Sequence, residues 1–280
     1  MPSYDARMVP ARPALAARHL EGTVDAARFV DGVVREVVDP QAPMRRTPAP
    51  DAPLDTEALR GERVTIYETT DEGWAWGQLV DDHYVGWLPA NALAAPGPTP
   101  THRVAVVRTL IFPAPSFKLP PILALPFGAR LAAVPHDDRF AAALGGYIPA
   151  RHLASIADLE HDFVAVAERF LGAPYLWGGK TGLGLDCSGL VQIAVAACGI
   201  PCPRDSDMQE TSLGEPVDGR TFRRGDLLFW KGHVAIVRDP HTLLHANAFH
   251  MAVGVEPIAA AIDRIRPTDG EVRSVRRLAQ

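Results

Sequence analysis

One pattern of eight residues occurs twice in the first half of the chain, and it constrains the fold more than any other feature of the sequence. Residues 86–93 read G-W-L-P-A-N-A-L and residues 146–153 read G-Y-I-P-A-R-H-L. Upstream, the run that begins at Gly61 aligns in the same way with the run that begins at Gly128. Two matches in the same order indicate an internal repeat, so we expect two copies of one small domain.

Short β-like runs separated by turns fill the first copy. Residues 63–67, 74–80 and 84–88 are rich in β-branched and aromatic side chains, and proline-rich stretches at 40–53 and 96–100 flank them. The 26 prolines and 23 glycines of the 280 residues favour many turns over long helices. Strands this short and this closely spaced predict a small β-barrel.

The pattern changes from Asp158 onward. Apolar residues at spacings of three and four predict an amphipathic helix that Gly172 ends, and the small apolar residues of 188–198 predict a buried helix that ends at Gly199. Sequential strands of one sheet are then predicted at residues 225–230, 233–237 and 243–246, with a further candidate at 253–257. Helices followed by an antiparallel sheet indicate an α+β domain.

Cys187 has the most reactive predicted position of the three cysteines. It comes directly before the buried helix, where the positive end of the helix dipole and unpaired backbone N–H groups favour a thiolate. The same N–H groups could hold an oxyanion. Cys198 and Cys202 lie at or beyond the other end of that helix, so we expect them to serve packing. Three cysteines do not suggest a disulfide framework, which fits a reducing compartment.

Two histidines could complete a catalytic site around this thiol. His233 opens one predicted strand and shares its face with Ala235 and Val237, while His245 lies in the next strand. Antiparallel pairing could bring His245 beside His233 as its orienting partner. We therefore predict Cys187 as nucleophile, His233 as general base and His245 as the third residue, an arrangement typical of acyl-transfer enzymes.

Composition and motifs argue against several other functions. The 28 Lys and Arg residues against 33 Asp and Glu give a net charge of −5, so nucleic acid is not an expected partner. No apolar run approaches a membrane span, and arginines interrupt the first thirty residues, so we expect a cytoplasmic protein without a signal peptide. The adjacent Asp81 and Asp82 lack further spaced ligands, and no CxxC or HExxH motif occurs; neither a metal nor another cofactor is predicted.

Five ordered motifs in the second half resemble the NlpC/P60 family of cysteine peptidases. The resemblance covers residues 155–280 and implies a compact papain-like α+β fold with Cys187, His233 and His245 in the roles given above. It also implies that the hydroxyl of Tyr175 faces the active site near the cysteine. The motifs are D-C-S-G-L-V at 186–191, R-D-S-x-x-Q at 204–209, G-D-L-L-F-W at 225–230, G-H-V-A-I-V at 232–237 and L-L-H-A at 243–246.

The repeated pattern G-W-L-P-x-x-x-L resembles the closing strand of bacterial SH3 domains, although the second copy lacks a counterpart of Trp74 and Trp76. We therefore expect a multi-domain protein, in which two small SH3-like β-barrels precede the α+β peptidase domain. The expected parts are an N-terminal arm at 1–30, SH3-like domains at 31–96 and 97–154, and the peptidase domain at 155–280.

This layout is similar to a narrower group, the γ-D-glutamyl-L-diamino acid endopeptidases that act as dipeptidyl peptidases on murein peptides. The resemblance implies cleavage after L-Ala-γ-D-Glu in peptides with a free L-Ala amino group, in cell-wall peptide recycling. It implies substrate binding by Glu62 and Tyr84, which would close the non-primed end of the cleft. Further substrate-binding candidates are Asp186, Ser188, Arg204, Asp205 and Ser206.

Two of these residues carry specific expectations. Arg204 could pair either with Asp186 or with the α-carboxylate of the substrate's D-Glu. Glu62 aligns with Ala129 in the second repeat, so the scaffold itself does not require an acid there. The alternatives to hydrolysis are a cell-wall peptide binding module with a degenerate site, or a thiol acyltransferase or amidase of the same fold.

Overall fold

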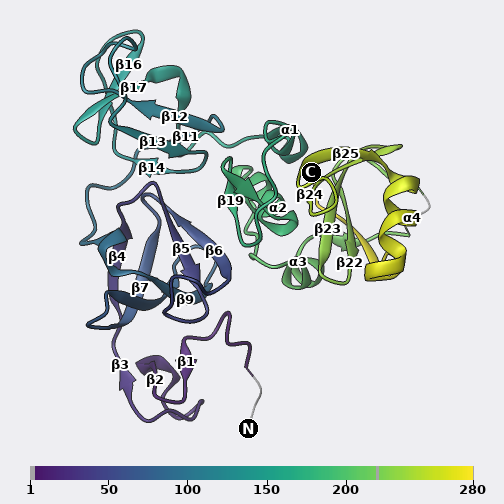
Figure 1. Cartoon of the computed structure of the whole chain (residues 1–280), viewed down its shortest axis with the longest axis horizontal. Helices are drawn as coiled ribbons and strands as arrows, with labels where there is room; N and C mark the ends of the chain where they lie inside the picture. The colour runs from purple at the N-terminus through teal and green to yellow at the C-terminus, as the bar shows by residue number, and fades with distance from the viewer. Residues whose placement is uncertain (1–3, 219–220, 280) are drawn as a thin grey trace. The chain divides into compact units, whose positions relative to one another are not determined.

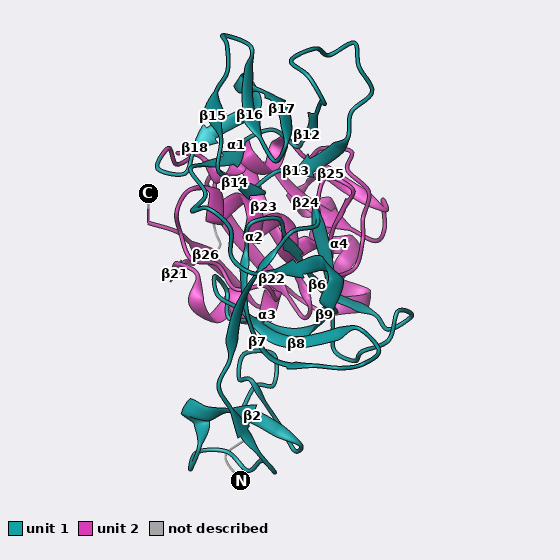
Figure 2. Ribbon diagram, turned by 90° about the vertical axis from the view of Figure 1, so that its left-hand side faces the viewer, with its two compact units in different colours: residues 1–157 teal, residues 158–280 magenta. Residues whose placement is uncertain are grey.

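The computed structural model describes residues 4–218 and 221–279, and the chain divides into two compact units, residues 1–157 and 158–280 (Figure 2). The first unit consists almost entirely of short strands. The second contains all four α-helices of the described residues and a six-stranded sheet.

The N-terminal segment folds onto the first barrel. It contains a 3-10 helix, η1 (Arg18–Leu20), and three strands that form one sheet: β1 (Ala11–Arg12), β2 (Leu15–Ala17) and β3 (Phe29–Val30). Leu15 is fully buried in a cluster with Trp76, Val85 and Trp87. The Arg12 guanidinium stacks over the rings of Trp76 and Trp87, 4.7 and 4.8 Å from their centroids. These contacts attach the arm to the barrel.

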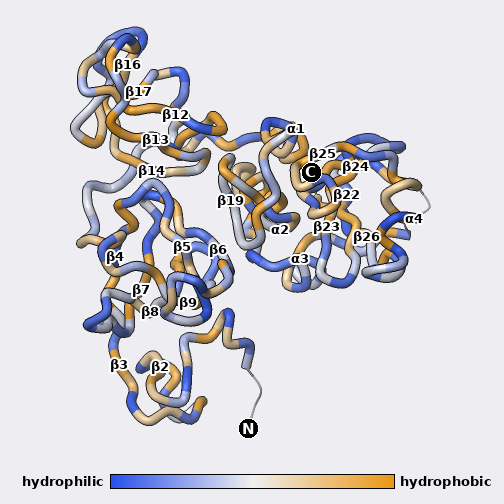
Figure 3. The backbone as a smooth tube through the Cα atoms, viewed as in Figure 1, coloured by the Kyte–Doolittle hydropathy of each residue, from blue (hydrophilic) through white to orange (hydrophobic). Residues whose placement is uncertain are grey.

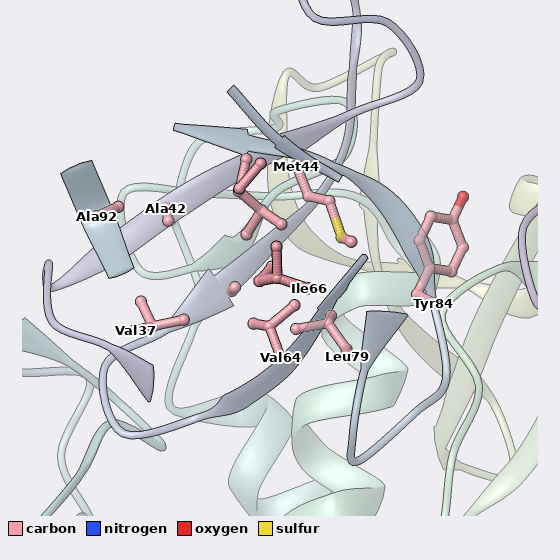
Figure 4. Packing of buried hydrophobic residues seen from close by; sticks show 11 residues of the cluster. Val37, Ala42, Met44, Val64, Ile66, Leu79, Tyr84 and Ala92 are labelled. Atoms are coloured by element: carbon pink, nitrogen blue, oxygen red, sulfur yellow. The ribbon is translucent and has the colours of Figure 1, made fainter. Parts of the chain in front are cut away.

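Seven strands form the sheet of the first barrel, in the order β10-β4-β7-β8-β9-β5-β6. Their bounds are β4 (Val33–Val37), β5 (Gln41–Arg45), β6 (Leu54–Leu59), β7 (Arg63–Thr69), β8 (Trp74–Leu79), β9 (Val85–Pro89) and β10 (Leu93–Ala94). The three predicted strands of this region correspond to β7, β8 and β9. The curled sheet encloses an apolar core that includes Val37, Met44, Ile66 and Leu79 (Figure 4).

Smaller sheets make up the rest of the first unit. They are β14-β11-β18, β12-β13 and β15-β16-β17. The bounds are β11 (His102–Val104), β12 (Arg108–Ile111), β13 (Leu123–Pro126), β14 (Arg130–Leu131), β15 (Val134–Pro135), β16 (Phe140–Ala143), β17 (Gly146–Pro149) and β18 (Leu153–Ser155). They share a separate core around Val104, Ile111, Leu125 and Ile148.

The two sequence repeats adopt the same local structure. In the first, β9 leads through the 3-10 helix η2 (Ala90–Ala92) into β10; in the second, β17 leads through η3 (Ala150–His152) into β18. Gly61 and Gly128 both have a positive φ, +80° and +82°, a backbone region that favours glycine. The assignment of the second copy to the SH3 class stays a prediction.

The helices of the second unit are α1 (Phe163–Glu168), α2 (Cys187–Ala197), α3 (Ser206–Ser212) and α4 (Ile258–Asp269). α2 begins one residue earlier than predicted. α1 is shorter than predicted, because the N–H groups of Arg169, Phe170 and Leu171 bond three residues back in tight turns. Phe170 nevertheless stays buried, as the apolar spacing required.

The sheet of the second unit has the order β21-β26-β22-β23-β24-β25 and is antiparallel throughout. Its strands are β21 (Glu215–Pro216), β22 (Asp226–Trp230), β23 (His233–Asp239), β24 (Thr242–Asn247), β25 (Ala252–Pro257) and β26 (Ser274–Arg277); a separate pair is β19 (Lys180–Thr181) and β20 (Gly184–Leu185). The predicted sequential strands are thus confirmed as β22 to β25.

Helices α2 and α4 flank this sheet (Figure 1). α2 is apolar along most of its length (Figure 3), and ten of its eleven residues are buried. Ala235, Val237 and Leu243 of the sheet pack with Ile258 and Ala261 of α4. The face that His233 shares with Ala235 and Val237 is therefore the face that α4 covers.

Among residues 4–218 and 221–279, no helix combines the length and apolar character needed to cross a membrane.

Replacing Leu15 tests whether the N-terminal segment stabilises the first barrel. Leu15→Ala leaves a cavity beside Trp76 and Trp87, so it should lower the local stability by about 2–5 kcal/mol. Hydrogen exchange of the β8 and β9 amides in the full chain measures this loss. Val33→Ala, at a position 54% exposed on β4, should stay within about 0.5 kcal/mol. Equal exchange in both variants would contradict the attachment.

Candidate active site

Asp186 fixes the start of α2, the helix whose first residue is Cys187. Its carboxylate accepts the backbone N–H of Gly189 at 2.7 Å, and thereby caps the helix. It also accepts the backbone N–H of Gly178, at 2.8 Å, from the loop before β19. The cap therefore holds the preceding loop and the nucleophile in one arrangement.

Arg204 pairs with this buried cap. Its Nη1 and Nη2 donate to the two oxygens of Asp186 at 2.9 and 2.8 Å, and Nη1 also donates to Ser188 Oγ at 2.9 Å. The Arg204 side chain has no exposed area. Of the two partners expected for Arg204, the structure shows Asp186, and this burial argues against direct contact between Arg204 and a substrate.

Cys187 is 7% exposed and lies against the start of β23. Backbone N–H groups of Val234 and Ser188 donate to its sulfur. Burial, followed by the negative charge of Asp186, nevertheless raises the pKa of the Cys187 thiol to about 12, although those N–H groups and Arg204 act in the other direction. Desolvation thus opposes the thiolate that the helix dipole favours, and a resting thiolate at Cys187 stays a prediction.

His233 and His245 meet as their strands predicted. His233 Nε2 lies 2.8 Å from His245 Nδ1, a distance that joins the two rings by one hydrogen bond. Burial, followed by the electrostatic interactions with His245 and Arg264, lowers the pKa of His233 to about 3. The pKa of His245 is lowered too, mainly by burial. These shifts favour a neutral thiol and neutral imidazoles in the resting site.

The chain of hydrogen bonds continues to a residue that sequence analysis did not single out. His245 Nε2 lies 2.9 Å from Glu256 Oε1, and Arg264 of α4 donates to both Glu256 oxygens, at 2.5 and 3.2 Å. Burial raises the pKa of Glu256, but hydrogen bonds from His245 and Arg264 outweigh this effect and lower it to about 2. The only sequence signal was an acid in the predicted strand 253–257.

Tyr175 is half-buried, in the loop before β19. Burial raises the pKa of its hydroxyl to about 12, and the charges of Cys187 and Asp186 add to this effect. These electrostatic interactions are consistent with the predicted position of Tyr175 near the nucleophile.

Two further substrate-binding candidates lie at the start of α3. Asp205 is the N-cap residue of α3 and Ser206 is its first residue, and both are half-exposed. They follow Arg204 directly, so the buried ion pair of Arg204 with Asp186 fixes the backbone from which their side chains extend. Their role in substrate binding stays a prediction.

The two candidates in the first unit have different surroundings. Glu62 is half-buried, and its Oε2 accepts the backbone N–H of Leu59 at 2.9 Å, a local role that the comparison with Ala129 did not anticipate. The Tyr84 ring packs at the edge of the barrel core with its hydroxyl directed away from Leu79 (Figure 4).

Tyr84 also lines a pocket of about 490 Å³ between the N-terminal segment and the barrel. Asp55 lines the same pocket, whereas Glu62 lines a separate small hollow beside Leu79. Closure of a substrate cleft by Glu62 and Tyr84 stays a prediction.

No group of three or more His, Cys, Asp or Glu side chains suited to a metal ion occurs among the described residues. None of the three cysteines forms a disulfide. Cys198 is the C-cap residue of α2 and Cys202 follows it, so both lie away from the positive end of the helix.

Comparisons with known proteins match both units. Residues 44–93 match the bacterial dipeptidyl-peptidase SH3 domain, and residues 172–263 match the NlpC/P60 family. The solved structure of an NlpC/P60 family protein from Bacillus cereus covers 89% of this chain and all of its own, with a TM-score of 0.74 at 21% identity, which shows a shared fold.

Two curated relatives carry the same name, gamma-D-glutamyl-L-lysine dipeptidyl-peptidase. The one from Bacillus cereus is 34% identical over 105 residues, which are 35% of this chain and 31% of that protein. The one from Bacillus subtilis is 28% identical over 221 residues, which are 69% of this chain and 72% of that protein. The match thus spans about a third of the Bacillus cereus relative's length.

Residues 172–263 form a domain of the NlpC/P60 family. Residues 44–93 form an SH3 domain of the bacterial dipeptidyl-peptidase class.

Removing Arg204 tests the importance of the buried cap. Arg204→Ala leaves the Asp186 carboxylate without its buried cation, so it should lower the free energy of unfolding of the second unit by about 3–5 kcal/mol. Arg224→Ala is the matched control, because Arg224 pairs with Asp162, the cap of α1, at the surface, with side chains 39% and 46% exposed. It should cost at most about 1 kcal/mol.

Hydrogen exchange of the α2 amides in the full chain measures this difference. Similar protection of α2 in the two variants would show that the Arg204 pair does not hold the helix start.

Proposed function

We propose that this protein is a cysteine peptidase, which hydrolyses the bond between γ-D-glutamate and an L-diamino acid in murein peptides that begin with a free L-Ala, releasing L-Ala-γ-D-Glu. The observation that carries the proposal is the hydrogen bond between His233 and His245, together with the contact of the Cys187 sulfur with the N–H of Val234, the residue that follows His233 in β23. The names of the two relatives, which give a γ-D-glutamyl-L-lysine bond and a dipeptidyl-peptidase activity for those proteins, support the choice of bond and the release of a dipeptide.

The reaction begins with a neutral thiol and a neutral imidazole. Cys187 Sγ attacks the γ-carbonyl carbon while its proton passes to His233, so charge develops only as the carbon–sulfur bond forms. The tetrahedral oxyanion needs donors at the start of α2. Asp186 accepts the Gly189 N–H, and the Ser188 N–H donates to the Cys187 sulfur, which leaves the Cys187 N–H and the Tyr175 hydroxyl as the candidates.

Collapse of this intermediate breaks the carbon–nitrogen bond, and the proton on His233 moves to the departing amine of the diamino acid. Water then attacks the thioester, with His233 accepting its proton, and releases L-Ala-γ-D-Glu and the free thiol. Transfer of the acyl group to an amine in place of water would make the chain an acyltransferase. Mass spectrometry of the reaction products separates the two outcomes, because only hydrolysis releases the free dipeptide.

The free amino group of L-Ala requires an anion at the non-primed end of the site. The SH3 domain at residues 44–93 is of the class named for dipeptidyl peptidases, which supports an origin of this anion in the first unit. A requirement for free L-Ala assigns the enzyme to peptides already released from the glycan, as in recycling.

We further propose that residues 97–154 form a second SH3-like domain, because the two repeats share the same strand–helix–strand structure.

Replacing the nucleophile tests the reaction itself. Cys187→Ala should abolish cleavage of L-Ala-γ-D-Glu-L-Lys and of its diaminopimelate analogue, because no other group can form the thioester. Mass spectrometry of the products measures this, and Cys198→Ala, a thiol of the same helix region, should leave turnover unchanged. Unaltered hydrolysis by Cys187→Ala would exclude the mechanism, and loss in both variants would show that the assay reports folding.

Replacing acids of the first unit tests the preference for free L-Ala. A charge-assisted hydrogen bond is worth about 1.5–3 kcal/mol, so Glu62→Gln should reduce the ratio of kcat/KM for free over N-acetylated peptide about tenfold to a hundredfold. Asp55→Asn is the matched comparison, because Asp55 shares the pocket of Tyr84. A lower ratio only in Asp55→Asn would transfer the role to Asp55. Equal ratios in all three proteins would refute an amine site in the first unit.

A further inference from the structure

We infer that Glu256, held by Arg264, is a positioning residue of the active site, which fixes the tautomers of His245 and His233 so that the free Nδ1 of His233 serves as the base. This inference rests on the proposed function, because it explains how the same catalytic histidine is oriented. It adds Glu256 and Arg264 to the proposed catalytic residues Cys187, His233 and His245.

The direction of each hydrogen bond follows from the chemistry of its partners. An ionised carboxylate can only accept, so His245 must donate its Nε2–H to Glu256 Oε1 across the 2.9 Å contact. A neutral imidazole carries one proton, which leaves a lone pair on His245 Nδ1. That atom lies 2.8 Å from His233 Nε2, so His233 must donate there. Its remaining nitrogen, Nδ1, then has the lone pair that a general base needs.

Arg264 ensures that Glu256 can only accept. It donates Nη2–H to Oε1 at 2.5 Å and Nε–H to Oε2 at 3.2 Å, a two-point contact that favours the ionised carboxylate. His250 approaches the same Oε1 at 3.1 Å from the surface. The Arg264 guanidinium also lies 4.4 Å above the ring of Phe249, which limits its movement.

The sheet explains why these groups meet. Glu256 and Gly254 occupy the same face of β25, and Gly254 pairs directly with His245 of β24. Chain direction reverses from β25 into α4 after Pro257, and α4 covers this face of the sheet, so Arg264 on its second turn reaches back to Glu256. The carboxylate is largely buried, with its side chain 11% exposed.

The contribution of Glu256 is orientation more than net charge. Its negative charge is matched by Arg264, and the pair together brings little net field to His233. A hydrogen-bond acceptor at this point is nevertheless indispensable, since without it His245 can place its proton on Nδ1. His233 would then present Nδ1–H to the thiol and could not accept its proton.

Nitrogen-15 NMR of the wild-type full chain tests the tautomers directly. Two-dimensional spectra that correlate ring nitrogens with ring protons should show His245 and His233 both protonated at Nε2 at neutral pH, with assignments made from His245→Gln and His233→Gln. A proton on His245 Nδ1 would overturn the inference, and this measurement requires no Glu256 variant to fold.

Kinetics of Glu256 variants supply the second test. Glu256→Ala removes the acceptor and should lower kcat about tenfold to a hundredfold with little change in KM. Glu256→Gln keeps an acceptor oxygen, which the Arg264 donors orient toward His245, so it should lose clearly less than Glu256→Ala. A folded Glu256→Ala variant with wild-type kcat, or equal losses in the two variants, would refute a positioning role.

Glu168→Gln is the matched control, because Glu168 pairs with Arg224 and Arg238 in the same unit, away from the histidines, and should leave kcat unchanged. Turnover of the murein tripeptide by the wild type separates this inference from the proposed function. Cleavage together with a proton on His245 Nδ1 refutes only the inference, whereas the expected tautomers without cleavage refute only the function.

Discussion

The second unit depends on a buried charge at the start of α2. Asp186 and Arg204 lie in a region with almost no exposed area, where either charge alone would be strongly unfavourable. Together they bind the loop before β19, the first turn of α2 and the backbone leading into α3. Cys187 and Ser188 on α2, and Asp205 and Ser206 at the start of α3, therefore extend from backbone next to this pair. The histidines extend from the sheet.

In the proposed mechanism, a second polar network carries the proton chemistry. It runs from His233 through His245 to Glu256 and Arg264, and each step is a hydrogen bond between groups buried by the sheet and α4. Burial raises the pKa of Cys187 and lowers that of His233, which favours their neutral forms, and in the proposed mechanism it also removes water from the charges that form during attack. A proton transfer that would be unfavourable in the resting site becomes favourable only once a carbonyl carbon is available to accept the sulfur's electrons.

Local sequence patterns predicted the parts of the site that depend on neighbours along the chain. Cys187 at a helix start and His233 and His245 on adjacent strands follow from helix and strand periodicity, and the structure brings the two histidines together.

Glu256 and Arg264 were missed because α4 has an interior proline, Pro267, and a weak apolar pattern, and because their contact depends on how α4 folds back over the sheet. The effect of burial on the Cys187 pKa was not predicted, since the helix dipole is visible in a sequence whereas desolvation depends on the whole fold. The partner of Arg204 was left open for the same reason, and the turn closed by Glu62 was not predicted.

The central claim is that His233 activates Cys187 by accepting its proton as the sulfur attacks, and the rate of alkylation by iodoacetamide at neutral pH tests it most directly. Mass spectrometry can follow Cys187 with Cys198 and Cys202 as internal standards in the same sample. Replacing His233 with glutamine should slow alkylation of Cys187 about a hundredfold or more, with unchanged rates at the other two cysteines. Equal rates at Cys187 in the wild type and in His233→Gln would contradict the account.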